Sequence, residues 1–234
     1  TLGCSLTVTW YSAAGVGSIA LTTTGGTSHI LGAGGTVSTT DGATGLVLNA
    51  GGGVGVGGAL DTALGGTGLL SITTSGASAD GNVTIVEANA LPVANVKLNT
   101  AASAQAVSLT ASTGDVTFGA ASIGDAADDL TLVSTAGEVV GGAGVATANV
   151  LVLGAATGIG ASGALTTAAQ SIGATTTAGN IDIDNALGTT TTITALTTAG
   201  ASTIKCDYTG VRGLALGRCS DTAPGQGQLA RTRG

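Results

Sequence analysis

The sequence predicts an all-β fold, a parallel β-helix (β-solenoid) of about ten coils with roughly 20–24 residues in each coil. Three observations support this fold class. The chain of 234 residues contains 42 Gly and 43% hydrophobic residues. Only 8% of its residues are charged and 2% are aromatic. A short glycine-containing motif recurs in its second half, flanked by runs of alternating apolar and polar residues.

The composition predicts a narrow and regular core. Disordered chains are usually charged and poor in β-branched residues, whereas this chain carries Val, Ile, Leu and Thr throughout. Irregular globular cores use large rings and flexible thioethers, but this chain has one Trp, two Tyr, one Phe and no Met. We therefore expect an interior of Val, Ile, Leu and Ala that is only a few residues wide.

The recurring motif, in forms such as Ser-Thr-Ala-Gly and Thr-Thr-Ala-Gly, is predicted to form the corners of the coils. Its corner glycines are nearly evenly spaced along the chain, at Gly114, Gly137, Gly158, Gly179 and Gly200. Gly adopts tight or left-handed backbone conformations at little cost. A structural turn therefore explains the motif better than a ligand site does.

Strands are predicted on both sides of these corners from an alternation with a period of two residues. The residues expected to face the core are the pairs Val107 and Leu109, Leu130 and Leu132, Val150 and Val152, Val116 and Phe118, and Ile181 and Ile183. We expect parallel pairing between coils, because Asn-Gly and Asp-Gly hairpin turns do not occur in the regular repeats.

One solenoid domain is predicted over residues 1–204, with the repeats clearest over residues 105–204. The spacing widens between Gly76 and Gly114, so an irregular coil or loop is expected near residues 88–104, which include Pro92. Residues 205–234 lose the repeat, and we expect them to form a non-repetitive basic tail that acts as a cap or linker.

Charge is unevenly distributed along the chain. Lys97 is the single basic residue before residue 205, and eleven of the 13 acidic residues precede residue 205, so that part carries a net charge of about −10. This acidic body argues against nucleic-acid binding, and the basic tail is too sparse to support it. The uncharged stretch 139–181 is too rich in Gly, Thr and Ser for a transmembrane helix.

The sequence predicts no enzyme, no cofactor and no metal site. The acids Asp182 and Asp184 share one strand face, where a solvated surface explains them better than a Ca²⁺ site does. His29 is the single histidine, and without a nucleophile motif it is expected to be a polar loop residue. A Gly53-x-Gly55-x-x-Gly58 match to a dinucleotide-binding fingerprint is attributed to glycine abundance, because no βαβ pattern surrounds it.

Three cysteines are present, and Cys206 and Cys219 form a candidate disulfide in an oxidising compartment. Free thiols at both positions are the alternative, and Cys4 would stay unpaired. A zinc site is not expected, because no Cys-x-x-Cys pair occurs.

Outward threonines form the candidate functional face. In stacked coils, equivalent positions make rows along the axis, so repeated Thr residues would line one side. The candidate Thr row comprises Thr175, Thr177, Thr190, Thr192 and Thr194. Such rows would order water, which makes an ice-binding solenoid one alternative function.

Residues 130–137 (LTLVSTAG) and 177–183 (TAGNIDI) resemble the repeats of filamentous-haemagglutinin-like exoproteins. These are the large β-helical adhesins of two-partner secretion, to which related autotransporter passengers are similar. The resemblance covers residues 105–204 well and residues 5–104 loosely. It implies a right-handed parallel β-helix, export across the bacterial outer membrane, and a role in adhesion or aggregation. The amino-terminal secretion domain of that family has no match in this chain.

From these observations we expect a secreted or cell-surface structural β-solenoid, part of an adhesin or an aggregation-promoting exoprotein of the bacterial outer surface. Its partners would be a host or neighbouring-cell surface, or further copies of the chain stacked end to end. A self-assembling extracellular filament subunit is the second alternative, because uncapped coil ends expose unpaired strand edges.

Overall fold

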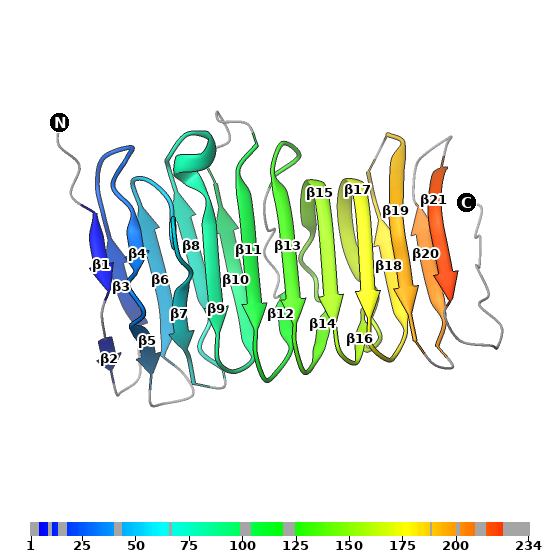
Figure 1. Cartoon of the computed structure of the whole chain (residues 1–234), viewed down its shortest axis with the longest axis horizontal. Helices are drawn as coiled ribbons and strands as arrows, with labels where there is room; N and C mark the ends of the chain where they lie inside the picture. The colour runs from blue at the N-terminus through cyan, green and yellow to red at the C-terminus, as the bar shows by residue number, and fades with distance from the viewer. Residues whose placement is uncertain are drawn as a thin grey trace.

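The computed structural model is a rod of stacked parallel strands, which confirms the predicted parallel β-solenoid (Figure 1). It describes residues 5–8, 11–13, 18–39, 44–65, 67–98, 104–118, 125–187, 189–199, 202–208 and 214–221. Every strand pairing among these residues is parallel. The strands therefore form coils that stack along the long axis.

The strands have the following bounds, in chain order: β1 Leu6–Val8, β2 Tyr11–Ala13, β3 Ser18–Thr22, β4 Ile30–Gly32, β5 Thr36–Thr39, β6 Gly45–Ala50, β7 Leu60–Ala63, β8 Leu70–Thr74, β9 Val83–Glu87, β10 Leu91–Lys97, β11 Ala106–Ala111, β12 Val116–Phe118, β13 Asp129–Ser134, β14 Glu138–Val140, β15 Ala146–Ala155, β16 Gly158–Ile159, β17 Leu165–Thr176, β18 Ile181–Asn185, β19 Thr191–Thr198, β20 Ile204–Tyr208 and β21 Leu214–Asp221. A short 3-10 helix, η1, spans Ser78–Gly81.

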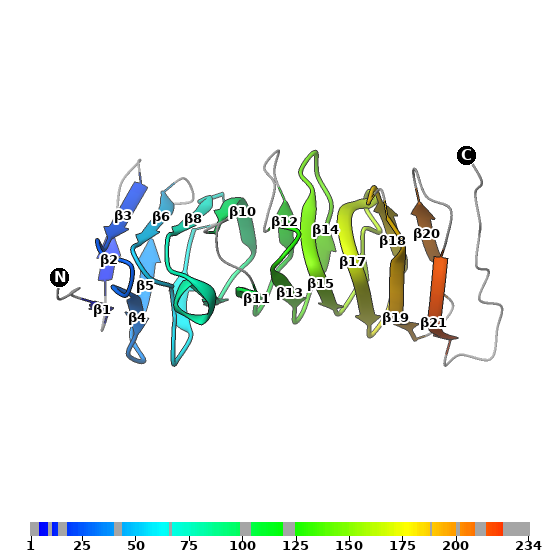
Figure 2. The same cartoon turned by 90° about the horizontal axis from the view of Figure 1, so that it is seen from above.

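Two stacks of strands form opposite sides of the rod (Figure 2). The odd-strand stack consists of β9, β11, β13, β15, β17, β19 and β21, each paired with the next. The even-strand stack consists of β12, β14, β16, β18 and β20. Strand β10 extends the even-strand stack toward the N-terminus, because it pairs with both β12 and β8, and β6 and β3 follow.

The register of the odd-strand stack gives the length of each coil. One inward row runs through Val83, Val107, Leu130, Leu151, Ile172 and Ile193, and Leu216 pairs in register with Ile193. The sequence numbers of this row advance in nearly equal steps, and from Leu130 to Ile193 the steps are identical. The corner glycines from Gly137 to Gly179 advance by the same step. The spacing read from the corner glycines is therefore confirmed as the coil length.

The structure has about seven turns, so the predicted count of about ten coils is wrong. Toward the N-terminus the coils break into more and shorter strands. The step from Val54 to its neighbour Val83 is longer than any step in the regular turns, and η1 lies in the added length. The predicted count assumed one uniform repeat length for the whole chain, and that assumption fails where coils differ in length.

The core is a single column of small apolar side chains inside the coils. Its buried residues run from Val8 to Ile204 and are Val, Ile, Leu and Ala, with Phe118 as the one buried aromatic ring of the described part. Buried and partly exposed residues alternate strictly along β11 and β13. The predicted narrow core is therefore confirmed, and so is the period of two.

One of the predicted inward pairs is wrong. Leu151 and Leu153 are buried in β15, whereas Val152 is 44% exposed and Val150 is half-buried on the outer side. In a Val-Leu-Val-Leu run both phases of the alternation are apolar, so the sequence alone does not select one. Pairing of Leu130 with Leu151 selects the leucines. The other predicted inward pairs are buried.

Residues 88–104 are more regular than expected. Pro92 lies within β10, whose first part pairs with β12 and whose second part pairs with β8. The register shifts between Val93 and Asn95, so β10 bends where it changes neighbours. The predicted irregularity is therefore a bend within a strand, and residues 99–103 lie outside the described residues.

The solenoid does not end near residue 204, so the expectation of a non-repetitive tail from residue 205 is wrong. Strand β20 pairs with β18 over Ile204 to Tyr208, and β21 pairs with β19 as far as Asp221. The tail carries the strand alternation without the Thr-Ala-Gly motif, which is why its repeat is hard to see. Residues 222–234 lie outside the described residues.

Candidate functional surface

The outward side chains of β9, β11, β13, β15, β17 and β19 form three rows along one side of the rod. We call this side the smooth face. The first row is Ala106, Asp129, Val150, Ser171 and Thr192; the second is Thr84, Ser108, Thr131, Val152, Gly173 and Ala195; the third is Val86, Thr110, Val133, Gly154, Thr175 and Thr197. Neighbours within a row lie on adjacent strands, about 4.8 Å apart.

The smooth face is almost uncharged. Asp129 is the single charged residue in these rows, and the other members are Gly, Ala, Ser, Thr or Val. Val152 is one of the few large apolar side chains exposed in the described part of the chain. A surface of this kind offers shape and apolar area to a partner, but few functional groups for chemistry.

The five candidate threonines are exposed but do not form one row, which corrects the predicted Thr row. Thr192 pairs with Ser171, and Thr175 pairs with Thr197. A register shift between Ile172 and Gly173 displaces Thr194, whose hydroxyl donates a hydrogen bond to the Ile172 carbonyl at 3.1 Å. Thr177 and Thr190 lie beyond the paired strands, outside the rows.

The corner glycines occupy tight positions for two different reasons. Gly179 has a φ of 82°, and a Cβ there would collide with the Thr157 carbonyl of the preceding coil. Gly114 has no positive φ, but a Cβ there would lie 2.7 Å from the Cβ of Ala90. At Gly137 a Cβ would likewise collide with Asp115. Close approach between coils, rather than left-handed backbone alone, therefore requires glycine.

Gly158 and Gly200 are the two remaining corner glycines. Gly158 has a φ of 153°, so it belongs with Gly179 among the positions that disfavour a side chain. Gly200 lies outside the described residues. The structural role predicted for the motif thus has direct support at each described corner glycine.

Buried hydroxyl groups hold the same corners together, and the sequence reasoning did not identify them. Thr198 is buried, and its hydroxyl donates to the Gly179 carbonyl at 2.8 Å. The Thr176 hydroxyl lies 2.9 Å from that of Thr198 on the next coil. At an earlier corner the Ser134 hydroxyl donates to the Gly114 carbonyl. The Ser and Thr residues of the motif therefore donate hydrogen bonds to backbone carbonyl groups at the corners.

A second buried network surrounds Asn185. Its Oδ1 accepts hydrogen bonds from the Thr167 hydroxyl at 2.8 Å and the Ala169 N–H at 2.9 Å. Its Nδ2 donates to the Ala169 carbonyl and to the Thr191 hydroxyl. Since each of these groups is paired, the network fixes the corner between β17, β18 and β19 at little desolvation cost.

Glu87 is a fully buried carboxylate in the N-terminal half. It accepts hydrogen bonds from the Thr62 hydroxyl at 2.6 Å and from the N–H groups of Leu64 and Asn89 at 2.9 and 3.0 Å. Burial raises the pKa of Glu87, and these hydrogen bonds partly oppose that rise. The group ties two coils, because Thr62 and Leu64 belong to the coil before β9.

Asp182 and Asp184 lie on the same face of β18, as expected, and Lys205 from the next coil pairs with Asp182. Lys205 Nζ lies 3.2 Å from Asp182 and 2.9 Å from Asp207. Hydrogen bonds to Asp207 and Asp182 raise the pKa of Lys205. Asp184 pairs in register with Asp207. This cluster is an inter-coil ion pair on the surface.

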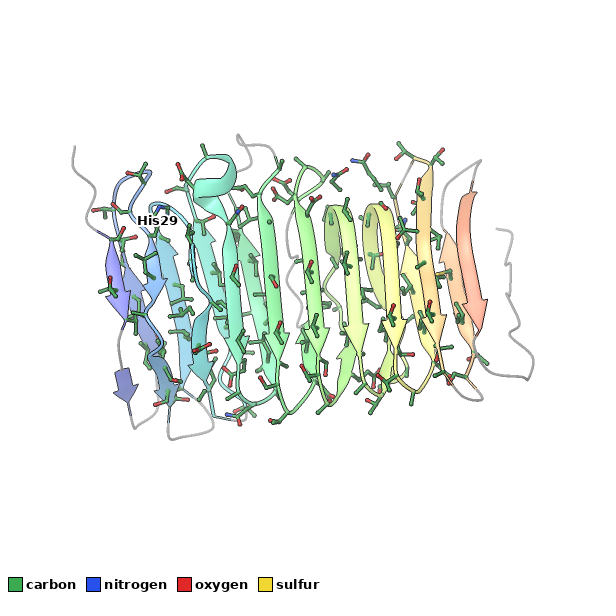
Figure 3. All side chains as sticks on the ribbon, in the orientation of Figure 1. His29 is labelled. Carbon is green, nitrogen blue, oxygen red and sulfur yellow. The ribbon has the colours of Figure 1, made fainter. Side chains whose placement is uncertain are left out.

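His29 lies near the N-terminal end of the rod (Figure 3). Its Nδ1 accepts a hydrogen bond from the Gly53 N–H at 2.9 Å, and its ring occupies the space that a Cβ on Gly52 would need. Val54 pairs with Ile30 on one side and with Val83 on the other, so the glycine-rich stretch is packed between two neighbouring coils. Close backbone packing therefore accounts for Gly53 and Gly55.

The candidate disulfide joins positions on two consecutive strands. Cys206 lies on β20 opposite Ile183, and Cys219 lies on β21 opposite Leu196. These strands belong to opposite stacks of the same coil. The side chain of Cys219 and all of Cys4 are outside the described residues, so the pairing stays a prediction.

The described residues contain no group of three or more His, Cys, Asp or Glu side chains placed to hold a metal ion. Within the same residues, no helix has the length and apolar character needed to span a membrane. Comparisons with family models, curated proteins and solved structures find no match.

Proposed function

We propose that this chain is a non-enzymatic structural segment of a secreted or cell-surface adhesin, and that the smooth face is its contact surface. The observation that carries the proposal is the smooth face itself. Its three outward rows cross neighbouring strands of the odd-strand stack, from β9 to β19, and contain one charged residue. Val152 is exposed near the middle of this face, among small residues that leave it accessible to a partner. The repeats that resemble filamentous-haemagglutinin-like exoproteins support the same function.

The rigidity of the stack supports an adhesive role. Each coil hydrogen-bonds to the next through every strand, so the contact surface is held in place by the core rather than by mobile loops. A preformed surface loses little conformational entropy when it binds. Many weak contacts along one rod then add up, as in other multivalent binding.

Bead adhesion tests this proposal. Beads coated with the whole chain should bind to cells or to a lawn of chain-expressing bacteria more than albumin-coated beads do. Val152→Lys places a charge at the centre of the smooth face and should reduce binding several-fold. Val140→Lys, on β14 in the opposite stack, is the matched control and should leave binding unchanged. Equal binding by albumin-coated beads would overturn the proposal.

Ice binding is a second candidate for the same surface. The smooth face exposes Thr175 and Thr192 among other small residues. Its interruptions by Gly173 and by the displaced Thr194 weaken this reading, since ordered water needs a regular array. Thermal hysteresis with ice shaping would favour this candidate, and its absence at millimolar protein concentration would remove it.

A further inference from the structure

A corner at the start of β11 and β13 contains buried polar side chains whose hydrogen-bonding capacity is incompletely used. Gln105 precedes β11 and Asp128 precedes β13, and pairing of Ala106 with Asp129 places them side by side on consecutive coils. Both residues are fully buried. The Gln105 N–H donates to Asp128 Oδ1 at 3.1 Å.

Two oxygen atoms at this corner lack partners among the described residues. They are Asp128 Oδ2 and Gln105 Oε1. The orientation of the Gln105 amide is fixed, because its Nε2 donates to the Gly76 carbonyl at 2.7 Å and that carbonyl can only accept. Buried polar oxygens without a donor are rare and costly, so each points to a group that completes it.

A second carboxylate lies beside the buried one. Asp125 is half-buried, and its Oδ1 accepts a hydrogen bond from the Ala127 N–H at 2.8 Å. Burial, together with the nearby Asp125 carboxylate, raises the pKa of Asp128 to about 6. Among the side chains that the structure describes, the ion pairs of Lys205 are with Asp182 and Asp207, and no lysine or arginine pairs with Asp125 or Asp128. Near pH 7 this corner holds two acidic groups without a countercharge.

We propose that the carboxylates of Asp125 and Asp128, with the carboxamide oxygen of Gln105, bind a Ca²⁺ ion at this corner. Ca²⁺ accepts carboxylate and amide oxygens in irregular arrangements and takes its remaining ligands from water. Water can reach the ion on the side of Asp125, because Asp125 is only half-buried. Zn²⁺ is disfavoured because the three proposed ligands are all oxygen atoms, whereas Zn²⁺ sites in proteins are built mainly from nitrogen and sulfur ligands. Mg²⁺ is disfavoured because it demands near-octahedral geometry.

The surrounding backbone is shaped for these side chains. A Cβ on Gly81 would collide with the Gln105 amide, so glycine there makes room for that side chain. Two coils contribute ligands, because Gln105 and the 125–128 segment belong to consecutive turns. A bound ion would therefore clamp these coils together, and its effect would appear in stability as well as in binding.

Calorimetric titration of the metal-stripped whole chain with CaCl₂ at pH 7.5 tests the proposal. We expect one Ca²⁺ per chain and a higher unfolding temperature with Ca²⁺ than with EDTA. Asp128→Asn and Asp125→Asn should each weaken binding by about ten-fold or more, the size seen when metal-site groups are removed. Asp129→Asn, which changes the neighbouring exposed acid, should bind like the wild type.

Two results would overturn the proposal. One is no heat and no change in unfolding temperature up to millimolar CaCl₂ for the folded wild type, as checked by circular dichroism. The other is undiminished Ca²⁺ binding by Asp128→Asn. If a proton alone completes the corner, Asp128→Asn will unfold at a higher temperature than wild type at pH 7.5, and Ca²⁺ will not change either protein.

Discussion

Between β11 and β19 the coils are nearly equal in length, whereas the single coil step from Val54 to Val83 is longer and includes a 3-10 helix. The regular half closes its corners with short motifs of Gly, Ser and Thr. The irregular half uses long-range polar ties from His29, Glu87 and Gln105. Side chains join neighbouring coils in both halves. In the regular half these are small hydroxyl and amide groups at repeated corners, such as Thr198 and Asn185, whereas the irregular half uses larger single groups, including the buried acid Glu87.

The largest effect is expected at a corner of the regular half. Gly179→Val should destabilise the chain by about 4 kcal/mol, because it combines an unfavourable φ with a collision against the preceding coil. Urea unfolding followed by circular dichroism measures this change. Gly163→Val is the matched control, since a Cβ there has nothing within 4 Å, and it should cost about 0.5 kcal/mol or less. Similar losses in both variants would refute the corner role.

The second effect probes the irregular half. Glu87→Ala removes the acceptor for the buried Thr62 hydroxyl and Leu64 N–H and for the part-buried Asn89 N–H, and it should cost about 3 kcal/mol in urea unfolding. Glu138→Ala is the control within the regular half, because Glu138 bonds to Ser162 at the surface, and about 0.5 kcal/mol is expected. If Glu138→Ala proved the more damaging change, the contrast between the halves would be wrong.

The third effect lies at the boundary between the halves and depends on pH. The folded state raises the pKa of Asp128 from 3.8 to about 6, so the ionised form is disfavoured and stability falls as the pH rises between these two values. In EDTA, lowering the pH from 7.5 to 5 should stabilise the wild type by about 1 kcal/mol through this group. Asp128→Asn should lose that part of the pH dependence. A smaller dependence of the same sign should remain, because the pKa of Glu87 is also raised.

The smallest effect is expected at the surface ion pair of the regular half. Lys205→Gln breaks contacts with Asp182 and Asp207, but the Lys205 side chain is 44% exposed and well solvated. We expect no measurable shift of the urea midpoint, and no difference in its salt dependence. A shift as large as that of Glu87→Ala would show that the C-terminal coils also depend on a charged side chain for their stability.

The regular half was largely predictable from sequence because each of its signals recurs. The glycine spacing indicated the coil length, and pairs such as Leu130 and Leu132 identified the inward positions. The phase of β15 could not be predicted, because both faces of its Val-Leu-Val-Leu run are apolar. Strands β20 and β21 were missed because the corner motif does not continue after residue 204, although the alternation of apolar and polar residues does.

The polar interior could not be predicted from a hydropathy pattern. Glu87, Gln105 and Asp128 look like loop residues in the sequence, and their burial arises only when a neighbouring coil covers them. A weak signal does exist before the strands of the odd-strand stack. Polar residues recur at the equivalent positions Gln105, Asp128, Asn149, Gln170 and Thr191, each one residue before the first outward row. Aligning the coils would have revealed that column.

The parallel stacking of coils also determines how the rod would carry load. Each coil contacts mainly its two neighbours, so coils pulled along the axis are links in series, and tension is the same in every link. The chain then yields first at its weakest junction, however strong the others are. A clamp at the 105–128 corner would reinforce one such junction and move the point of rupture elsewhere along the rod.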